Sequence, residues 1–173
     1  MEKGQANGAE ASVPLVLVVD DDDNDIVLFR RAVQQLKYAG SVHYIESGSQ
    51  AIAYLAGEGD FEDRTRFPAP DFLILDLKMP GINGFDILTW LQSHGIRSLR
   101  TVVVSSSDDM QEVTRAYALG AGSFLVKANS FTEFKETVGA LLAYFGDYHR
   151  NADDSDKAGF AQAVAGTLRG NTG

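Results

Sequence analysis

Two groups of acidic residues each follow a short run of apolar residues. Four aspartates at positions 20–23 come directly after residues 15–19, and Asp76 comes directly after residues 72–75. In a chain without cysteine, carboxylate oxygens favour a hard cation that keeps part of its water, which indicates Mg²⁺. The two groups can share one ion only if the apolar runs lie side by side.

A hydroxyl group and an ammonium group follow two further apolar runs. Ser105 comes after residues 101–104, and Lys127 comes after residues 123–126. A carboxylate beside Mg²⁺ and a lysine is equipped to become an acyl phosphate. The carboxylate supplies the nucleophile, while Mg²⁺ and the lysine ammonium offset the charge on the transferring oxygens. The residue types therefore indicate phosphoryl transfer to an aspartate.

The apolar runs are predicted to be strands, because such runs are typical of strands buried on both faces of a parallel sheet. The predicted strands are residues 15–19, 42–45, 72–75, 101–104 and 123–126. Between and after these strands, apolar residues recur with helical spacing, which predicts helices within residues 25–36, 49–55, 85–91, 109–119 and 131–145. Asp108 or Asp109 is expected to cap the fourth helix, and Gly120 to end it.

This alternation, (βα)₅, predicts an α/β fold with a doubly wound, five-stranded parallel sheet of the flavodoxin-like type and strand order 2-1-3-4-5. Strands one and three are neighbours in that order. Asp20, Asp21 and Asp76 are therefore expected to meet at the carboxyl edge of the sheet. Ser105 and Lys127 are expected to approach the same edge from strands four and five.

Composition limits the class of protein. The chain has 173 residues, which is enough for one domain, and a formal net charge of −9 from 24 acidic and 15 basic residues. No basic cluster suited to a phosphate backbone is present, so direct nucleic-acid binding is not expected. We also find neither an apolar run long enough to span a membrane nor the apolar core of a secretory signal. A cytoplasmic protein is the expectation.

In its motifs the chain resembles the receiver domain of two-component response regulators. The resemblance covers about residues 13–146. It rests on Val-Val-Asp-Asp at 18–21, Leu-Asp-Leu-Lys-Met-Pro-Gly at 75–81 with Gly84, the hydroxyl run after Val104, and Lys127. Residues 1–12 are expected to be a disordered leader. Residues 147–173 are expected to be a tail, either disordered or forming a short docking helix.

The resemblance implies a role for each matching residue. Asp76 would accept a phosphoryl group from a histidine kinase. The metal ligands would be Asp20 (through water), Asp21, Asp76 and the carbonyl of Lys78. Lys127 would pair with the acyl phosphate, Ser105 would hydrogen-bond it, and Phe124 would be the switch aromatic. The protein would thus be a signalling protein that assists its own phosphorylation and dephosphorylation, and not an enzyme.

A narrower resemblance is to single-domain regulators that partner phytochrome-type histidine kinases. It rests on the segment Asp25-Ile-Val-Leu-Phe-Arg-Arg-Ala, the long polar loop at 57–70, and Ala116-Tyr-Ala-Leu-Gly. Three departures from the wider family matter. Lys78 adds a cation beside the site, at a position where the family varies. Ala128 stands where a cis proline is usual, which predicts a trans peptide and a less firmly placed Lys127. Phe124 lacks the hydroxyl of a switch tyrosine, so any switch relies on packing.

Two other functions compete with a stand-alone phosphoacceptor. One is a Mg²⁺-dependent phosphohydrolase with an aspartyl nucleophile, although Lys78 stands where such enzymes commonly place a general acid. The other is a degenerate, unphosphorylated interaction module. We also predict a homodimer through the fourth helix, fifth strand and fifth helix. The large apolar residues that suggest it are Phe131, Phe134, Val138, Leu141, Leu142, Tyr144 and Phe145.

Overall fold

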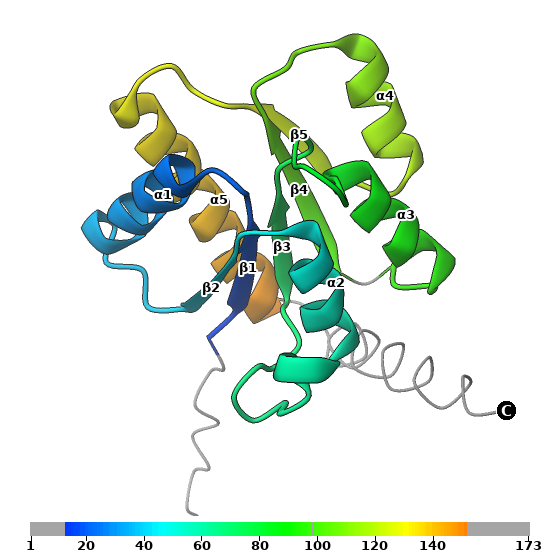
Figure 1. The fold of residues 1–173 in the computed structure, drawn as a ribbon. Coiled ribbons are helices and arrows are strands. Elements are labelled where there is room, and N and C mark those ends of the chain that lie inside the picture. Colours follow the sequence, from blue (N-terminus) through cyan, green and yellow to red (C-terminus); the bar gives the residue numbers. More distant parts are fainter. Residues whose placement is uncertain (1–12, 98, 152–173) are drawn as a thin grey trace, which may run out of the picture.

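The computed structural model describes residues 13–97 and 99–151, in which strands and helices alternate along the chain. The strands are β1 (Leu15–Val19), β2 (Ser41–Ile45), β3 (Phe72–Leu75), β4 (Arg100–Ser105) and β5 (Ser123–Val126). The helices are α1 (Asp23–Gln35), α2 (Gly48–Ala56), α3 (Gly84–Ser93), α4 (Met110–Ala118) and α5 (Phe131–Asn151), with a 3₁₀ turn at Gly59–Phe61. The strands form one parallel sheet in the order β2-β1-β3-β4-β5 (Figure 1), which confirms the predicted fold.

The central strands separate two hydrophobic cores. Figure 1 shows α1 and α5 on one face of the sheet and α2, α3 and α4 on the other. In β1, Leu17 and Val19 belong to the core under α2 and α3, whereas Val16 and Val18 belong to the core under α1 and α5. Both faces of β1 are covered, so all five of its residues are apolar and buried.

Strand register places the ends of β1 and β3 at the same level. Val19 pairs with Leu75, and the backbone N–H of Asp76 donates to the carbonyl of Val19 at 2.9 Å. The residue that follows each strand therefore emerges at the same edge of the sheet. This register, set by the match of two buried strands, brings Asp20 next to Asp76.

Helix ends follow local capping chemistry. Asp22 caps α1 by accepting from the backbone N–H of Asn24, so α1 begins at Asp23, two residues before the predicted start. Asn83 and Asp86 form a capping box at the start of α3. Asp109, one of the two predicted candidates, caps α4, and Gly120 after that helix has φ +97°, as its left-handed position predicts.

Helix α5 uses most of its large apolar residues inside the molecule. Val138, Leu142 and Phe145 are buried, and Phe131, Phe134 and Leu141 pack against the same core. Of the seven residues that suggested an exposed apolar surplus, only Tyr144 is an exposed large hydrophobic group. That expectation was wrong because α5 packs along α1 as well as against the sheet. The helix also continues to Asn151, past the expected domain end at residue 146.

The loop between α2 and β3 is well packed despite its polar composition. Phe61 and Phe67 pack edge-on against each other at 5.1 Å between ring centroids, and both contact the ring of buried Tyr54. The Tyr54 hydroxyl donates to the carbonyl of Pro68 at 3.0 Å. The loop is therefore held at the amino edge of the sheet, opposite the ends of β1 and β3.

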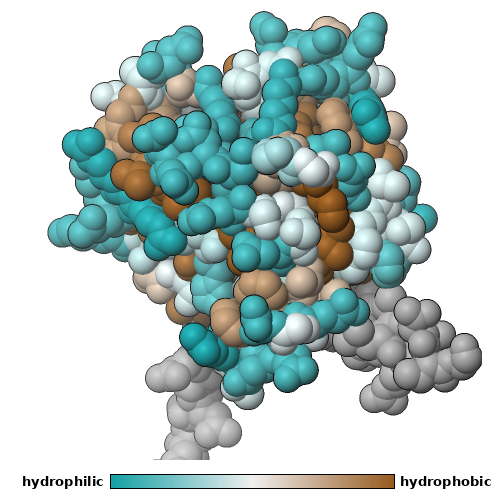
Figure 2. Space-filling model, in the orientation of Figure 1, coloured by the Kyte–Doolittle hydropathy of each residue, from teal (hydrophilic) through white to brown (hydrophobic). Residues whose placement is uncertain are grey.

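The face of the molecule drawn in Figure 2 is mostly polar. Figure 2 shows a face dominated by hydrophilic side chains, with hydrophobic ones visible only in small separate areas. None of the helices in the described ranges combines the length and apolar character that crossing a membrane requires. The predicted leader 1–12 and the tail beyond residue 151 lie outside the described residues.

Candidate functional site

Three carboxylates converge at the carboxyl edge of the sheet. Asp20 and Asp21 follow β1 and Asp76 follows β3, and one oxygen from each lies within 4.8 Å of the other two. Asp20 is only 8% exposed and Asp76 only 6%, while Asp21 is partly exposed. The structure thus brings together the three acids that the strand order predicted to meet.

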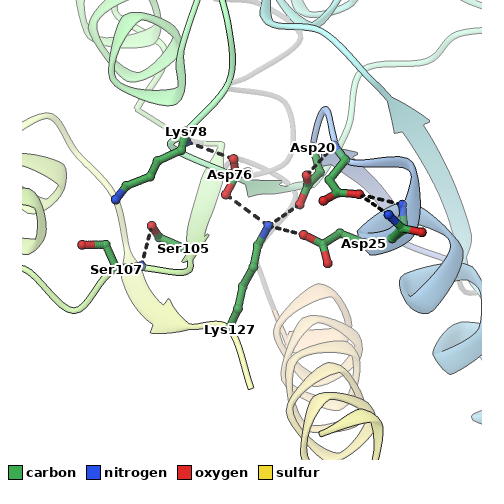
Figure 3. A network of polar contacts seen from close by, with 9 residues as sticks. Asp20, Asp25, Asp76, Lys78, Ser105, Ser107 and Lys127 are labelled. Carbon is green, nitrogen blue, oxygen red and sulfur yellow. Dashed lines mark hydrogen bonds and ion pairs between the residues drawn. The ribbon is translucent and has the colours of Figure 1, made fainter. Parts of the chain in front are cut away.

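The two buried carboxylates are held in the same way. One oxygen of Asp20 accepts from the backbone N–H of Asp22 at 3.0 Å, and one oxygen of Asp76 accepts from the N–H of Lys78 at 2.9 Å. In each case the second oxygen, Oδ2 of Asp20 and Oδ1 of Asp76, faces Lys127 (Figure 3). Each carboxylate therefore has one oxygen fixed by the backbone and one directed into the site.

Lys127 enters this site from the end of β5. Its Nζ lies 2.8 Å from Oδ2 of Asp20, 2.6 Å from Oδ2 of Asp25 and 3.3 Å from Oδ1 of Asp76. The described residues contain no cis peptide, so the bond to Ala128 is trans. A trans bond does not weaken the placement of Lys127 as we expected, because three carboxylates surround its ammonium group.

Burial and charge act in opposite directions on these groups. Burial raises the pKa of Asp20 and of Asp76, and the nearby Lys127 ammonium offsets only part of that effect. For Lys127, burial alone would lower the pKa, but hydrogen bonds with Asp20 and Asp25 and the charge of the acids raise it. The protonated form of Lys127 is therefore favoured, whereas burial disfavours the ionised forms of Asp20 and Asp76.

Ser105 lies near the acidic site at the end of β4 (Figure 3), and Phe124 is the second residue of β5, where it pairs with Val103. Ser105 is the last residue of β4 and is fully buried, and its hydroxyl oxygen accepts from the backbone N–H of Ser107 at 3.3 Å. Ser106 is exposed, so Ser105 is the serine of this run that the strand directs inward. Phe124 is partly buried against the core under α2, α3 and α4.

The side chain of Lys78 points away from the acids. Figure 3 shows it extending from the β3–α3 loop away from Asp76. Its Nζ lies 3.6 Å from Oε1 of Glu112 on α4, and its side chain is 51% exposed. The other carboxylate oxygen of Glu112 is buried without a hydrogen-bond partner in the described part of the chain. Lys78 thus contributes its backbone N–H to the site, while its side chain contacts α4.

Asp25 is the site residue that sequence reasoning missed. We expected it only to begin the first helix, but its carboxylate makes the shortest contact with Lys127. A signal for it was present in the sequence. Asp25 directly precedes Ile26, the first buried residue of α1, so it lies in the turn that faces the sheet edge.

The donor set fits Mg²⁺. The three acidic oxygens lie within 4.8 Å of one another, close to the ~4.2 Å that separates two oxygens on opposite sides of that ion. Oxygen donors without cysteine are also the ligand type that Mg²⁺ prefers. Asp20, Asp21 and Asp76 are the side chains that would hold it, and when bound it would neutralise charge on oxygens at the site.

Among known proteins, this chain is similar to response regulators. Residues 16–139 match the response regulator receiver domain family. The chain is 29% identical over 145 residues to a probable methanogenesis regulatory protein, FilR2, of Methanothrix harundinacea, covering 82% of this chain and 90% of that protein. It is also 22% identical over 132 residues to the response regulator Rcp1 of Synechocystis, with 76% and 88% covered.

Solved structures agree with this similarity. A response regulator in red light signalling of R. palustris has a TM-score of 0.71 and 27% identity, with 76% of this chain and 93% of that chain covered. The phosphorylated cyanobacterial phytochrome response regulator RcpA has a TM-score of 0.71 at 23% identity, covering 78% and 94%, and shows the shared fold. The narrower resemblance to phytochrome-partner regulators is confirmed. Because the family match covers most of the chain, including Asp20, Asp76 and Lys127, the chain belongs to the response regulator receiver domain family.

Proposed function

We propose that the protein is a single-domain response regulator that accepts a phosphoryl group from a histidine kinase onto Asp76. The observation that carries this proposal is the position of Asp76. It is buried at the end of the central strand β3, beside Asp20 and Asp21, with one oxygen 3.3 Å from the Nζ of Lys127. A nucleophilic oxygen, a cation that can offset charge, and oxygens that can hold Mg²⁺ are all present in one place.

The reaction we propose is an in-line displacement at phosphorus. An oxygen of Asp76 bonds to phosphorus as the bond from phosphorus to the kinase histidine nitrogen breaks. The electron pair stays on that nitrogen, which takes a proton from solvent. Lys127 offsets charge on the transferring oxygens, and the backbone N–H of Lys78 holds the carboxylate in orientation. Hydrolysis of the acyl phosphate would reset the protein, which thus assists its own phosphorylation and dephosphorylation without turning over a separate substrate.

Phosphorylation would be read through Ser105 and Phe124. We propose that the Ser105 hydroxyl turns from the Ser107 N–H to the phosphoryl oxygen, drawing the β4–α4 loop inward. Phe124 would then repack, since it has no hydroxyl and lies between core and surface. Such a two-state change would alter the face formed by α4, β5 and α5.

The partners we propose are a histidine kinase, of the phytochrome type, and a second copy of the chain. The relatives support the kinase type, because solved ones include a regulator of red light signalling and a phytochrome response regulator. Exposed Tyr117, Val126 and Tyr144, one each on α4, β5 and α5, support a homodimer on that face. A chain without cysteine also fits the reducing cytoplasm, where we place this function.

Labelling with acetyl phosphate tests the phosphoacceptor. With Mg²⁺ present, the chain should gain one phosphoryl group by intact mass, and Asp76→Asn should abolish that gain because Asn is not a nucleophile. Chelation of Mg²⁺ should reduce labelling by about a hundredfold, the size of effect expected from losing a metal that neutralises transition-state charge. The same assay with candidate histidine kinases as donors then identifies the partner.

Asp60→Asn is the matched control, because Asp60 is an exposed aspartate in the loop after α2. This variant should label like the unaltered chain. Undiminished labelling of Asp76→Asn would refute the assignment of Asp76. Steady turnover of a small phosphoester would instead support the phosphohydrolase alternative, and absence of any labelling would support the unphosphorylated interaction module.

A further inference from the structure

The ammonium group of Lys127 occupies the oxygens that the proposed reaction needs. On Asp20 and Asp76, one oxygen is held by a backbone N–H two residues later, and the other contacts Lys127. A cation or a phosphoryl group that uses the oxygen not held by the backbone must therefore share that oxygen with Lys127 or displace Lys127. A lysine with only these two partners would compete with the ion for the same oxygens.

Asp25 supplies a third partner from a different element. It lies in the first turn of α1, and it is not among the three acids whose oxygens converge on the candidate metal position. Its contact with Nζ, 2.6 Å, is the shortest of the three. The Asp25 side chain is 30% exposed against 11% for that of Asp20, so its charge is better hydrated. Lys127 can therefore give up its contacts with Asp20 and Asp76 and still keep a carboxylate partner in Asp25.

Buried neighbours fix Asp25 in this place. Asp22 caps the start of α1, and Ile26 and Phe29 anchor the same part of the helix in the core. The carboxylate is thus presented to the site by a rigid helix turn and not by a loose loop.

We propose that Asp25 is a positioning residue for Lys127. It retains the ammonium group when Mg²⁺ takes the oxygens of Asp20 and Asp76, and it keeps Nζ next to Asp76 for the phosphoryl group. This inference rests on the proposed function, since it assigns Asp25 a role in preparing that site. Lys127 and Asp25 together form a neutral pair, which leaves the three converging acids to the ion.

A double-mutant cycle on Mg²⁺ binding tests the inference. Calorimetric titration with Mg²⁺ alone is performed on the unaltered chain, Asp25→Asn, Lys127→Met and the double variant. Asp25→Asn should weaken Mg²⁺ binding about fivefold, the size of coupling found between neighbouring charged groups. Lys127→Met should tighten binding, because it removes the competing cation. In the Lys127→Met background, Asp25→Asn should change binding by less than about twofold.

Asp23→Asn is the matched control for charge. Asp23 is an exposed aspartate of the same turn and is not one of the three acids that contact Lys127 in the described residues. Its removal should weaken Mg²⁺ binding by less than about twofold in both backgrounds, as expected for an exposed charge screened by salt. Urea unfolding of each variant confirms that the comparison is made between folded proteins.

Each outcome decides. An equal effect of Asp25→Asn in both backgrounds would show that Asp25 acts only as a distant charge, and no effect in either would show that it has no role in Mg²⁺ binding. Either result overturns the inference. If Asp76 is labelled but this coupling is absent, the proposed function holds and the role of Asp25 is overturned. The coupling without labelling of Asp76 overturns the proposed function and keeps the role of Asp25. Absence of Mg²⁺ binding by the unaltered chain overturns the inference.

Discussion

Two cationic side chains, at opposite edges of the sheet, each have three oxygen partners. At the carboxyl edge, Lys127 contacts the carboxylates of Asp20, Asp25 and Asp76. At the amino edge, the guanidinium of Arg64 donates to three backbone carbonyls. These are the carbonyls of Tyr54, Leu55 and Phe67, at 2.8, 2.9 and 3.2 Å. The number of partners is the same, but the chemistry of the partners differs.

Their pKa values shift in opposite directions for this reason. Burial lowers the pKa of Arg64, because neutral carbonyls provide hydrogen bonds but no full negative charge. The pKa of Lys127 rises in spite of burial, because ionised Asp20 and Asp25 face it. Despite its lowered pKa, the Arg64 guanidinium stays charged at ordinary pH. Its partners are backbone carbonyls, which do not titrate, so a change of pH does not alter the acceptors around Arg64.

The contrast shows how one fold separates stability from function. Arg64 donates to two carbonyls in the last turn of α2, of which that of Tyr54 also accepts from the N–H of Gly57, and it joins the loop to that helix. The partners of Lys127 are side chains that can bind a proton, a metal ion or a phosphoryl group. A cation among ionisable, movable acceptors forms a switchable site, whereas a cation among backbone acceptors forms a structural one.

Removal of Arg64 is expected to produce the largest change in stability. Arg64→Met keeps most of the apolar volume but removes the guanidinium donor from the carbonyls of Tyr54, Leu55 and Phe67, of which that of Tyr54 keeps the N–H of Gly57. We expect the free energy of unfolding to fall by about 2 kcal/mol, measured by urea denaturation. Labelling of Asp76 should persist, because the loop lies at the other edge of the sheet. Arg66→Met, in the same loop but exposed, is the control, and an equal loss in that variant would contradict the structural role of Arg64.

Removal of a buried acid should act in the opposite direction, with a smaller effect. Because burial raises the pKa of Asp20, the folded state holds the ionised form less well than the unfolded state. Asp20→Asn should therefore increase the free energy of unfolding at neutral pH. The difference should disappear below the ordinary value of 3.8, where Asp20 is protonated in both states.

Added Mg²⁺ sharpens this test. The ion should stabilise the unaltered chain by binding only the folded state, and it should narrow the difference from Asp20→Asn. Urea denaturation at several pH values, with and without Mg²⁺, measures both effects. A loss of stability in Asp20→Asn at neutral pH would mean that the ion pair with Lys127 outweighs the burial of Asp20.

The smallest effect is expected at His43, beside the Arg64 loop. Burial lowers the pKa of His43, whose Nδ1 lies 2.7 Å from the hydroxyl of Tyr54. The pKa of His43 is lower in the folded state than its ordinary value of 6.5 in the unfolded state. The stability that His43 contributes is therefore fully present above pH 6.5 and is lost as the pH falls through the folded-state pKa. The free energy of unfolding should thus decline more steeply on acidification in the unaltered chain than in His43→Phe. Parallel pH profiles of the two proteins would contradict this expectation.

Much of the fold was predictable from short segments. Residues 15–19 and 72–75 consist only of apolar residues, which is the pattern of strands covered on both faces, and both are buried. The capping of α4 by Asp109 and its end at Gly120 also follow from local backbone chemistry. The start of α1 was predicted two residues late, because the apolar pattern begins at Ile26 whereas Asp22 caps the helix.

The partners of single side chains were less predictable. The large apolar residues of α5 suggested an exposed face, but packing against α1 and the sheet buries or partly buries all of them except Tyr144. The polar loop after α2 gave no sign that Arg64 would reach back to the end of that helix. Hydrophobic periodicity reports that a face is apolar, but it does not say which element covers it.

The sequence by itself determined the alternation of strands and helices, the family, and the acids that meet at one sheet edge. It could do so because periodicity, capping and the order of parallel strands follow from local chemistry and general connection rules. Only the tertiary structure decided that Asp25 is a partner of Lys127, 102 positions away along the chain, and that Lys78 turns toward Glu112. Such contacts depend on how a helix turn docks against a strand end, and that geometry comes from packing of the whole core.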